Sequence, residues 1–281
     1  MAPAIFPPDR VTIVGVLNLT PDSFSDGGRL LTTGGTPDRD AVLRTAEAMI
    51  AEGAGVLDLG GESTRPGAAT IPAPDEIARV ASALEAIAKR FDVPLSIDTR
   101  KAAVAAAALD AGATIVNDIS GLGHDPALAE LVARRGAGLV LGHLRGEPAT
   151  MQEQIVFRDV VQEVGDELAQ SIVLARAAGV ARERLAVDPG IGFGKRLPQN
   201  LALLARIGEI RERLDLPVLV GPSRKSFLGE LTGDAAGERD TATHAACAIA
   251  VFAGANAVRV HDVAGARRTA AVALALRRAR A

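Results

Sequence analysis

Polar side chains follow short apolar runs at several points of this 281-residue sequence. Residues 94–121 contain two such points. An apolar run ends at Asp98, an alanine-rich stretch follows, and a second β-branched run ends at Asn117 and Asp118. This order predicts strand, helix and strand, and a crossover helix makes the two strands parallel, so both strand ends point the same way. Two carboxylates and a carboxamide would then meet at the edge where α/β folds bind ligands.

The same pattern recurs along the chain and places nine polar residues at predicted strand ends. Any one of them could cap the following helix or bind loop amides. Charged groups are rarely buried without partners, however, so nine of them on one face favour a polar ligand. The nine are Asn18, Asp58, Asp98, Asn117, Asp118, His143, Asp188, Arg259 and His261.

The glycine-rich segment 188–195, DPGIGFGK, follows one of these strands. It is not a phosphate-binding P-loop, because the frame of that motif puts Pro189 where glycine is needed and Arg196 where Ser or Thr is needed. Its glycines would instead let the backbone approach a flat ligand closely. Phe193 is then either an exposed apolar contact or an ordinary core side chain.

Cations are found near the C-terminal end of the predicted fold. Residues 223–226, SRKS, follow the seventh predicted strand, and Arg259 and His261 alternate along the eighth, which places them on one strand face. Two adjacent cations between hydroxyls suit an anion or an aromatic ring. In barrels, phosphate groups usually bind after strands seven and eight, so we expect an anion here.

The sequence contains few residues that point to a metal site or to a reactive thiol. The chain has no His-Glu-x-x-His, Cys-x-x-Cys or His-x-His motif, so no tight transition-metal site is predicted. Asn18 and nearby oxygens suit a hard ion such as Mg²⁺, brought by substrate phosphates. We interpret His124 and His244 as structural or solvated. The single cysteine, Cys247, excludes an internal disulfide and is predicted to be a buried core thiol in a reducing compartment.

The composition excludes several classes of protein. A net charge of −3 and the lack of a long basic run argue against nucleic-acid binding. No apolar run approaches about 18 residues, so no membrane span is expected. The opening residues MAPAIFPPDR lack the apolar core of a signal peptide. We therefore predict a cytoplasmic protein with no nucleic-acid or membrane partner.

Alternating strands and helices must position these groups. Strands are expected at residues 11–17, 56–59, 94–98, 114–116, 139–141, 185–187, 218–220 and 258–260. Helices are expected at residues 38–52, 75–90, 125–135, 158–177, 200–214, 239–253 and from 263, besides the alanine-rich stretch after Asp98. Gly-Ala pairs at 53, 112, 136 and 254 mark helix-to-strand turns.

This alternation predicts an α/β fold, a single (β/α)8 TIM barrel. One domain would span residues 1–281, with a core at 11–265 and a short tail at 1–10. The alternative is an open doubly wound sheet. Long βα loops are expected at the C-terminal face, at 19–37, 61–74, 144–157 and 222–238. The polar, glycine-flanked segments 19–28 and 60–67 within them are predicted to be mobile lids.

Eight motifs in order give the chain its resemblance to the dihydropteroate synthase family, the pterin-binding enzymes of folate biosynthesis. They are GVLNLTPDSFSDGG at 15–28, DLGGESTRPG at 58–67, SIDT at 96–99, NDI at 117–119, TMQ at 150–152, DPGIGFGK at 188–195, SRKSFLG at 223–229 and RVHD at 259–262. One departure is GHL at 142–144, where the family usually has Met-His-Met at a position that lines the pterin pocket. We expect this change to affect packing rather than chemistry.

The resemblance implies a transferase reaction. The family joins 6-hydroxymethyl-7,8-dihydropterin pyrophosphate to p-aminobenzoate and releases pyrophosphate, with Mg²⁺ bound to the phosphates. The implied mechanism is dissociative, so pyrophosphate leaves before the aromatic amine attacks. Family members are usually homodimers through the last helices and are targets of sulfonamides, so both properties are expected here.

The resemblance also implies roles for individual residues. The pterin-binding groups would be Asp98, Asn117, Asp188 and Lys225. The p-aminobenzoate site would comprise Phe24, Thr64, Arg65, Pro66, Phe193 and Ser226. The pyrophosphate site would comprise Asn18, Arg259 and His261, with Asn18 also a metal ligand. The groups closest to the chemistry would be Asp26, Arg65, Asp98 and Lys225.

Three other functions remain as alternatives. A pterin-binding methyltransferase of the same superfamily would share Asp98, Asn117 and Asp188 but lack the two lids and the SRKS loop. An unrelated phosphate-binding barrel lyase or isomerase would need a Schiff-base lysine inside a strand or a catalytic glutamate at a strand end, and neither is found. A catalytically silent paralogue would bind pterin or a partner only.

Overall fold

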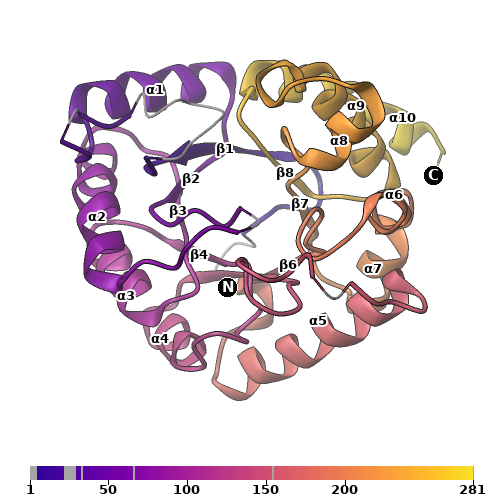
Figure 1. The fold of residues 1–281 in the computed structure, drawn as a ribbon, viewed down its shortest axis with the longest axis horizontal. Coiled ribbons are helices and arrows are strands. Elements are labelled where there is room, and N and C mark those ends of the chain that lie inside the picture. Colours follow the sequence, from indigo (N-terminus) through magenta and orange to yellow (C-terminus); the bar gives the residue numbers. More distant parts are fainter. Residues whose placement is uncertain (1–4, 22–29, 33, 66, 154, 281) are drawn as a thin grey trace.

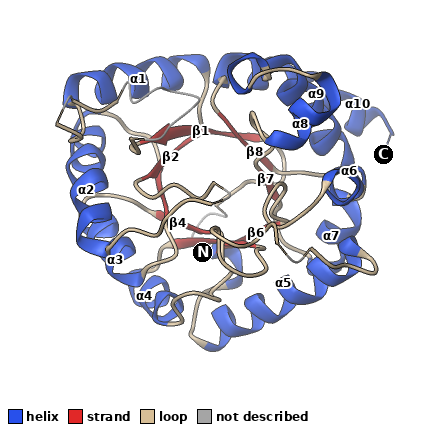
Figure 2. Ribbon diagram, viewed as in Figure 1, coloured by secondary structure: helices blue, strands red, loops and turns tan. Residues whose placement is uncertain are grey.

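Eight parallel strands form the centre of the molecule. The computed structural model describes residues 5–280 apart from 22–29, 33, 66 and 154. The strands are hydrogen-bonded in the order β6-β5-β4-β3-β2-β1-β8-β7. A parallel bridge between Val187 and Val218 joins the two ends of this sheet into a nearly closed ring, which the helices surround (Figures 1 and 2). The predicted TIM barrel is therefore confirmed, and the open sheet is excluded.

The elements follow one another as strand and helix along the whole described chain. The strands are β1 (Thr12–Asn18), β2 (Val56–Gly60), β3 (Leu95–Asp98), β4 (Ile115–Asp118), β5 (Gly138–Gly142), β6 (Leu185–Asp188), β7 (Leu219–Val220) and β8 (Ala257–Val260). The helices are α1 (Arg39–Glu52), α2 (Ala73–Arg90), α3 (Ala102–Asp110), α4 (Ala127–Arg135), α5 (Val160–Ala177), α6 (Leu197–Ala205), α7 (Ile207–Leu214), α8 (Ser226–Thr232), α9 (Asp240–Ala253) and α10 (Val263–Arg280), with short 3-10 turns η1 (Arg182–Arg184) and η2 (Ala236–Glu238).

Two apolar layers hold the barrel together. The larger lies between the strands and the surrounding helices, and because both strand faces are covered, the strands are nearly continuous Val, Ile and Leu runs. The smaller fills the barrel interior with one side chain from each of seven strands and with Phe6, which is fully buried. Within the predicted short tail at residues 1–10, Phe6 is therefore anchored, because its aromatic ring packs into the barrel interior.

The helix-to-strand turns are short and their glycines have the conformation expected. Gly53, Gly112, Gly136 and Gly254 all have positive φ, between 61° and 129°, which a residue with a Cβ rarely adopts. The connections that follow strands β1, β2 and β5 are much longer, whereas the long loop expected at 222–238 contains α8 and η2. The longer connections therefore lie at the C-terminal ends of the strands, where barrels place their ligand sites.

Two helix predictions are wrong in detail. The single helix expected at 200–214 is two helices, α6 and α7, which break at Arg206. The apolar stripe continues through the break from Leu203 and Leu204 to Ile207 and Ile210, so its spacing hid the break. Helix α8 was not predicted because its seven residues bury only two apolar side chains, too few to show a period.

No helix within the described residues is both long and apolar enough to span a bilayer.

Candidate active site

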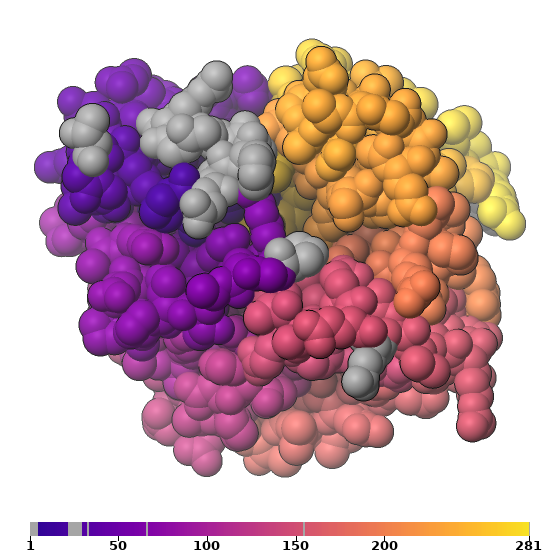
Figure 3. Space-filling model, in the orientation of Figure 1, coloured from indigo at the N-terminus to yellow at the C-terminus, as the bar shows by residue number. Residues whose placement is uncertain are grey.

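Strand register brings several predicted polar residues to one level of the barrel. Asn18 pairs with Gly60, Gly60 with Asp98, and Asp98 with Asn117, across four adjacent strands. Above them is a cavity of about 550 Å³ at the C-terminal ends of the strands. Segments from the beginning, middle and end of the chain meet around the centre of this face (Figure 3).

Every predicted site residue that the structure describes lines this cavity. They are Asn18, Thr64, Arg65, Asp98, Asn117, Asp188, Phe193, Lys225, Ser226, Arg259 and His261. Three further predicted residues, Phe24, Asp26 and Pro66, lie outside the described residues. The geometry thus gathers the eleven residues in one place, while their individual roles stay predictions.

A guanidinium shared by two carboxylates forms the floor of the cavity. Arg259 donates from Nε to Asp58 Oδ2 at 2.6 Å and from Nη2 to Asp98 Oδ2 at 2.8 Å. Asn117 Nδ2 lies 3.4 Å from the same Asp58 oxygen. The other oxygen of Asp98, Oδ1, is buried and has no hydrogen-bond partner within the described chain. Burial raises the pKa of Asp98 to about 7, although Arg259 opposes this shift.

Asp188 and Lys225 face each other across the next part of the floor. Asp188 Oδ1 accepts a hydrogen bond from Gly190 N at 2.7 Å, and burial raises the pKa of this carboxyl while Lys225 lowers it. Lys225 donates to the carbonyl of Ile191 and lies 3.8 Å from the centre of the Phe193 ring. Burial lowers the pKa of Lys225 to about 8. One carboxylate and one ammonium therefore lie beside an aromatic face, which suits a flat heterocycle with both donors and acceptors.

The glycine-rich segment is folded around a buried lysine that the sequence analysis did not single out. Lys195 donates to the carbonyls of Gly190 and Phe193 at 3.0 and 2.9 Å and to His143 Nδ1 at 3.0 Å. Gly190 has φ +68°, and a Cβ there would lie 1.9 Å from His143 O, so only glycine fits. Burial lowers the pKa of Lys195 to about 7. The sequence did carry one signal for this arrangement of backbone carbonyls around an ammonium group, namely a lysine at the end of a glycine-rich segment.

Asn18, Ser223 and His261 form a second polar group that lines the same cavity. Ser223 Oγ lies 2.9 Å from His261 Nδ1, and Asn18 Nδ2 lies 3.3 Å from His261 Nε2. This leaves the Asn18 carbonyl oxygen as a hard donor for Mg²⁺. No group of three or more His, Cys, Asp or Glu able to hold a metal occurs among the described residues. The residues therefore fit Mg²⁺ only if a ligand supplies most of its oxygens.

Three of the nine strand-end residues do not line the cavity. Asp58 lies beneath the cavity, where it accepts a hydrogen bond from Arg259 and so helps to hold that side chain in place. Asp118 accepts hydrogen bonds from Ser120 N at 2.8 Å and Leu122 N at 2.7 Å, so it caps its own loop. His143 is buried between Lys195 and Glu167, and burial lowers its pKa to about 4. For these three, a structural role replaces the expected ligand contact.

The expectation that residues 142–144 line the pocket is also wrong. The cavity is lined at this side by Ile119 and Met151 instead. A Cβ at Gly142 would lie 2.6 Å from Ile119 Cα, so a larger residue there would require the backbone of the loop after β4 to move. Ile119 and Met151 are apolar and gave no chemical signal in the sequence, although both belong to the motifs NDI and TMQ.

The remaining histidines and the thiol are structural, as predicted. His124 contacts Arg100 and Glu147, and His244 lies 3.1 Å from Asp262. Cys247 is fully buried in α9, and burial raises the pKa of its thiol to about 12, so it is unreactive at neutral pH.

Comparisons with known proteins agree with this site. Residues 14–261 match the family described as "Pterin binding enzyme". The chain is 44% identical to the dihydropteroate synthase of Escherichia coli K12 over 251 residues, which are 89% of this chain and 86% of that protein. A crystal structure of Yersinia pestis dihydropteroate synthase with a sulfonamide drug complex superposes with a TM-score of 0.92 at 39% identity, covering 99% of both chains. Thermus thermophilus dihydropteroate synthase in complex with 4-aminobenzoate superposes with a TM-score of 0.83 at 43% identity, covering 96% of both chains.

Proposed function

This chain belongs to the dihydropteroate synthases, a family of pterin-binding enzymes, and from that premise we propose how its cavity divides the two substrates. The enzyme is a transferase that condenses 6-hydroxymethyl-7,8-dihydropterin pyrophosphate with p-aminobenzoate to give 7,8-dihydropteroate and pyrophosphate. The observation that carries the proposal is the grouping of eleven predicted residues around one cavity. The strand-end residues Asp98, Asn117 and Asp188 would bind the pterin together with Lys225, and residues of the loops and of the start of α8 would bind p-aminobenzoate.

The pterin would bind on the floor, between Asp98, Asn117, Asp188 and Lys225. Its ring N–H and exocyclic amine form a donor pair that a single carboxylate can accept, and Asp188 is the carboxylate beside an open part of the cavity. Lys225 would donate to a ring acceptor on the same molecule. The free oxygen of Asp98 would accept from a ring nitrogen at the other end.

The pyrophosphate would leave towards Asn18, Arg259 and His261. Arg259 uses Nε and Nη2 on the two acids, so Nη1 is the part of its guanidinium that can meet a phosphate. When bound, Mg²⁺ would neutralise charge on the phosphate oxygens, with Asn18 Oδ1 as its protein ligand. The two cationic side chains would hold the departing anion on one side of the cavity.

p-Aminobenzoate would bind at the rim, where Phe193 contacts one face of its ring. Ser226 and a nearby backbone N–H would hold the carboxylate, while Thr64 and Arg65 close the other side. Phe24 and Pro66 are assigned here on the family resemblance alone. The amine would then point at the pterin carbon that carried pyrophosphate.

The reaction would be dissociative. Loss of pyrophosphate leaves a pterin cation, which the pterin ring and the carboxylates of Asp98 and Asp26 would stabilise before the amine attacks. The chain's contribution would be mainly electrostatic, with the two loops at 19–28 and 60–67 closing as lids to exclude water. Because Thr64 and Arg65 of the second predicted lid line the cavity, p-aminobenzoate would bind after the pterin substrate, and sulfonamides of similar shape would compete with it.

A homodimer through α9 and α10 is part of the proposal. These helices expose three large apolar side chains, Ile249, Val272 and Leu276, and the last two share one face of α10. A second copy would cover them. Analytical ultracentrifugation of wild type and Val272→Glu tests this, with a dimer expected for wild type and a monomer for the variant. A monomeric wild type would contradict it.

The test of the proposed activity is turnover of both substrates by the purified chain with Mg²⁺. We expect pyrophosphate release that depends on p-aminobenzoate. Pterin binding without turnover would instead identify the chain as a silent paralogue.

A further inference from the structure

Two buried cations lie beside the cavity without lining it. Arg100 and Lys101 are separated from Asp98, the last residue of β3, only by Thr99, and they precede α3. Their side chains are only 3% and 11% exposed, and neither is among the residues that line the cavity. Buried charges of this kind need partners, and apart from Glu76 of α2 the acidic partners come from two loops that carry residues of the cavity wall.

Glu62 is the partner that both cations share. Its Oε1 accepts from Lys101 Nζ at 2.7 Å and from Ile71 N at 2.9 Å, and its Oε2 lies 3.4 Å from Arg100 Nε. Lys101 also donates to Ile71 O at 2.6 Å and to the buried Glu76 at 2.8 Å. Glu62 belongs to the first arm of the loop after β2, residues 62–65. Its hydrogen bond with Ile71 N therefore ties this arm to the second arm, residues 67–71.

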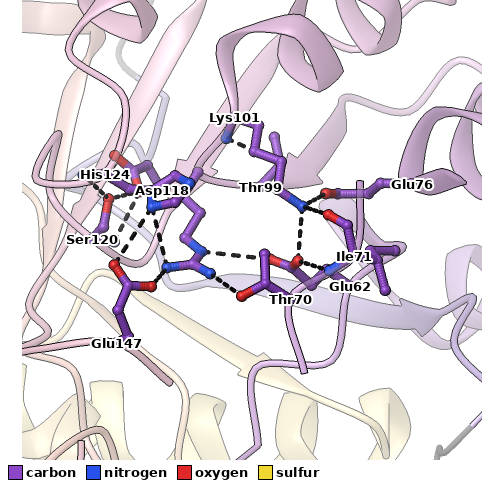
Figure 4. A network of polar contacts seen from close by, with 11 residues as sticks. Glu62, Thr70, Ile71, Glu76, Thr99, Lys101, Asp118, Ser120, His124 and Glu147 are labelled. Carbon is purple, nitrogen blue, oxygen red and sulfur yellow. Dashed lines mark hydrogen bonds and ion pairs between the residues drawn. The ribbon is translucent and has the colours of Figure 1, made fainter. Parts of the chain in front are cut away.

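Arg100 extends this network to a second loop. Its Nη2 donates to Thr70 Oγ1 at 3.1 Å, and its Nη1 bonds Glu147 in the loop after β5. In Figure 4, Glu62 and Glu147 lie on opposite sides of this network. Gly67 N also donates to Pro148 O at 3.4 Å, so the two loops touch directly as well.

Both loops carry residues of the cavity wall. Thr64 and Arg65 follow Glu62 within three positions, and Met151 belongs to a turn that begins at Glu147, whose carbonyl accepts from Met151 N at 2.8 Å. A displacement of either acid therefore moves a wall of the cavity. The floor residues Asp98 and Asn117, in contrast, are direct partners in the strand ladder.

We propose that Arg100, assisted by Lys101, is a positioning residue for the p-aminobenzoate side of the cavity, since it binds Glu62 and Glu147 together. This inference rests on the proposed function for the identity of the second substrate. The planar guanidinium of Arg100 makes this arrangement possible. It contacts four side chains, those of Glu62, Thr70, His124 and Glu147, and a compact ammonium could not reach all of them.

The test compares three variants of the full chain. Arg100→Lys keeps the buried charge but cannot span both acids, and Glu147→Gln removes only the link to the second loop, at a side chain that is 53% exposed. Glu130→Gln is the matched control, because Glu130 also pairs with an arginine but on the exposed surface of α4. We expect the KM for p-aminobenzoate to rise about tenfold in Arg100→Lys and about threefold in Glu147→Gln, with no change in the control, since small misplacements of binding groups are costly.

A merely structural role would not produce this selectivity. The affinity for a pterin ligand, measured by calorimetry, is expected to stay within about twofold of wild type in all three variants, because the floor is held by strand pairing. Equal losses for both substrates, or an unchanged KM for p-aminobenzoate in Arg100→Lys, would overturn the positioning role.

Hydrogen exchange supplies a readout that needs no activity. The Ile71 amide is held by Glu62, so it should exchange faster in Arg100→Lys than in wild type. Unchanged exchange would overturn the proposal even in an active enzyme. A wild-type chain that turns over neither substrate would contradict the proposed function, while the exchange experiment would still decide whether Arg100 fixes this loop.

Discussion

The floor and the rim of the cavity are built in different ways. Floor residues such as Asp98 and Asn117 are direct partners in neighbouring strands, so the backbone ladder sets their separation. Rim residues such as Thr64 and Phe193 lie on loops, and buried lysine and arginine side chains hold those loops in place. The floor therefore keeps its geometry as long as the barrel is folded, whereas the rim can change shape through a few side-chain contacts.

This difference fits the two substrates that the enzyme joins. The pterin carries a fixed pattern of donors and acceptors and needs a rigid partner. In the proposed order of binding, p-aminobenzoate enters after the pterin and approaches one carbon, which suits a rim that takes its final shape only after the pterin has bound. Changes to the floor should then abolish pterin binding, and changes to the rim should affect only the second substrate.

The largest effect is expected from Asp188→Asn on the floor. The amide accepts at one atom only, and its NH2 group would face the donors of the pterin. Breaking a buried charged contact costs about 2–5 kcal/mol, which corresponds to a loss of pterin affinity of roughly 30-fold or more. Calorimetry with a pterin ligand measures it, and Asp215→Asn, at an exposed carboxylate, is the control. Unchanged affinity in Asp188→Asn would show that the floor is wrongly assigned.

The next largest effect concerns the pyrophosphate side. Arg259→Ala and His261→Ala should each weaken pyrophosphate binding by about tenfold or more, because a hydrogen bond to a charged group is lost. Arg259→Ala should also lower thermal stability, since it leaves Asp58 and Asp98 buried without a cation. Pyrophosphate titrations with and without Mg²⁺ measure the first effect. Equal binding by wild type and both variants would refute the role.

These two predictions use residues that were found from the sequence alone, for a physical reason. Strand ends such as Asp98, Asn117 and Asp188 combine an apolar run with one polar residue, and parallel topology then places them together. The barrel itself followed from the same alternation. Tertiary contacts such as Lys195 to His143 Nδ1, or Arg100 to Glu147, join segments that lie far apart in the chain, so local spacing could not reveal them.

The same limit explains the wrong predictions. Asp118 ends β4 as Asp98 ends β3, and His143 follows the last residue of β5, but local loop amides and buried neighbours use their polar atoms. Phe6 precedes the first strand in a proline-rich stretch, and only the closed barrel provides the interior that buries it. The break at Arg206 lies within a continuous apolar stripe.

The pH dependence of the reaction should reveal the ionisation of Asp98 on the floor of the cavity. Burial raises the pKa of Asp98 to about 7, so its carboxylate is protonated below that pH and anionic above it. If the anion stabilises the pterin cation, kcat/KM should rise roughly tenfold between pH 6 and pH 8. Initial rates across this range test the prediction, and the residual activity of Asp98→Asn should lose this rise. A rise that persists in that variant would assign the titration to another group.

A smaller effect is expected from the buried lysine of the rim. Lys195→Met removes the donor shared by the carbonyls of Gly190 and Phe193 and should loosen the ring of Phe193. We expect the KM for p-aminobenzoate to rise about threefold, with pterin affinity nearly unchanged, because unsatisfied buried carbonyls cost about 1–3 kcal/mol and the loop relaxes. Steady-state kinetics for both substrates measure this difference between the two KM values. Lys89→Met, on the exposed surface of α2, is the control. A larger loss of pterin affinity than of p-aminobenzoate affinity would contradict the division between floor and rim.

The most direct test of this division is a set of initial rates with both substrates varied, in the absence and presence of a sulfonamide. We expect ordered binding, with the pterin pyrophosphate first, because the rim takes its final shape only when the pterin is bound on the floor. We also expect that the sulfonamide competes with p-aminobenzoate and does not compete with the pterin substrate. Tight binding of p-aminobenzoate to the free enzyme, or inhibition that p-aminobenzoate cannot relieve, would contradict this division.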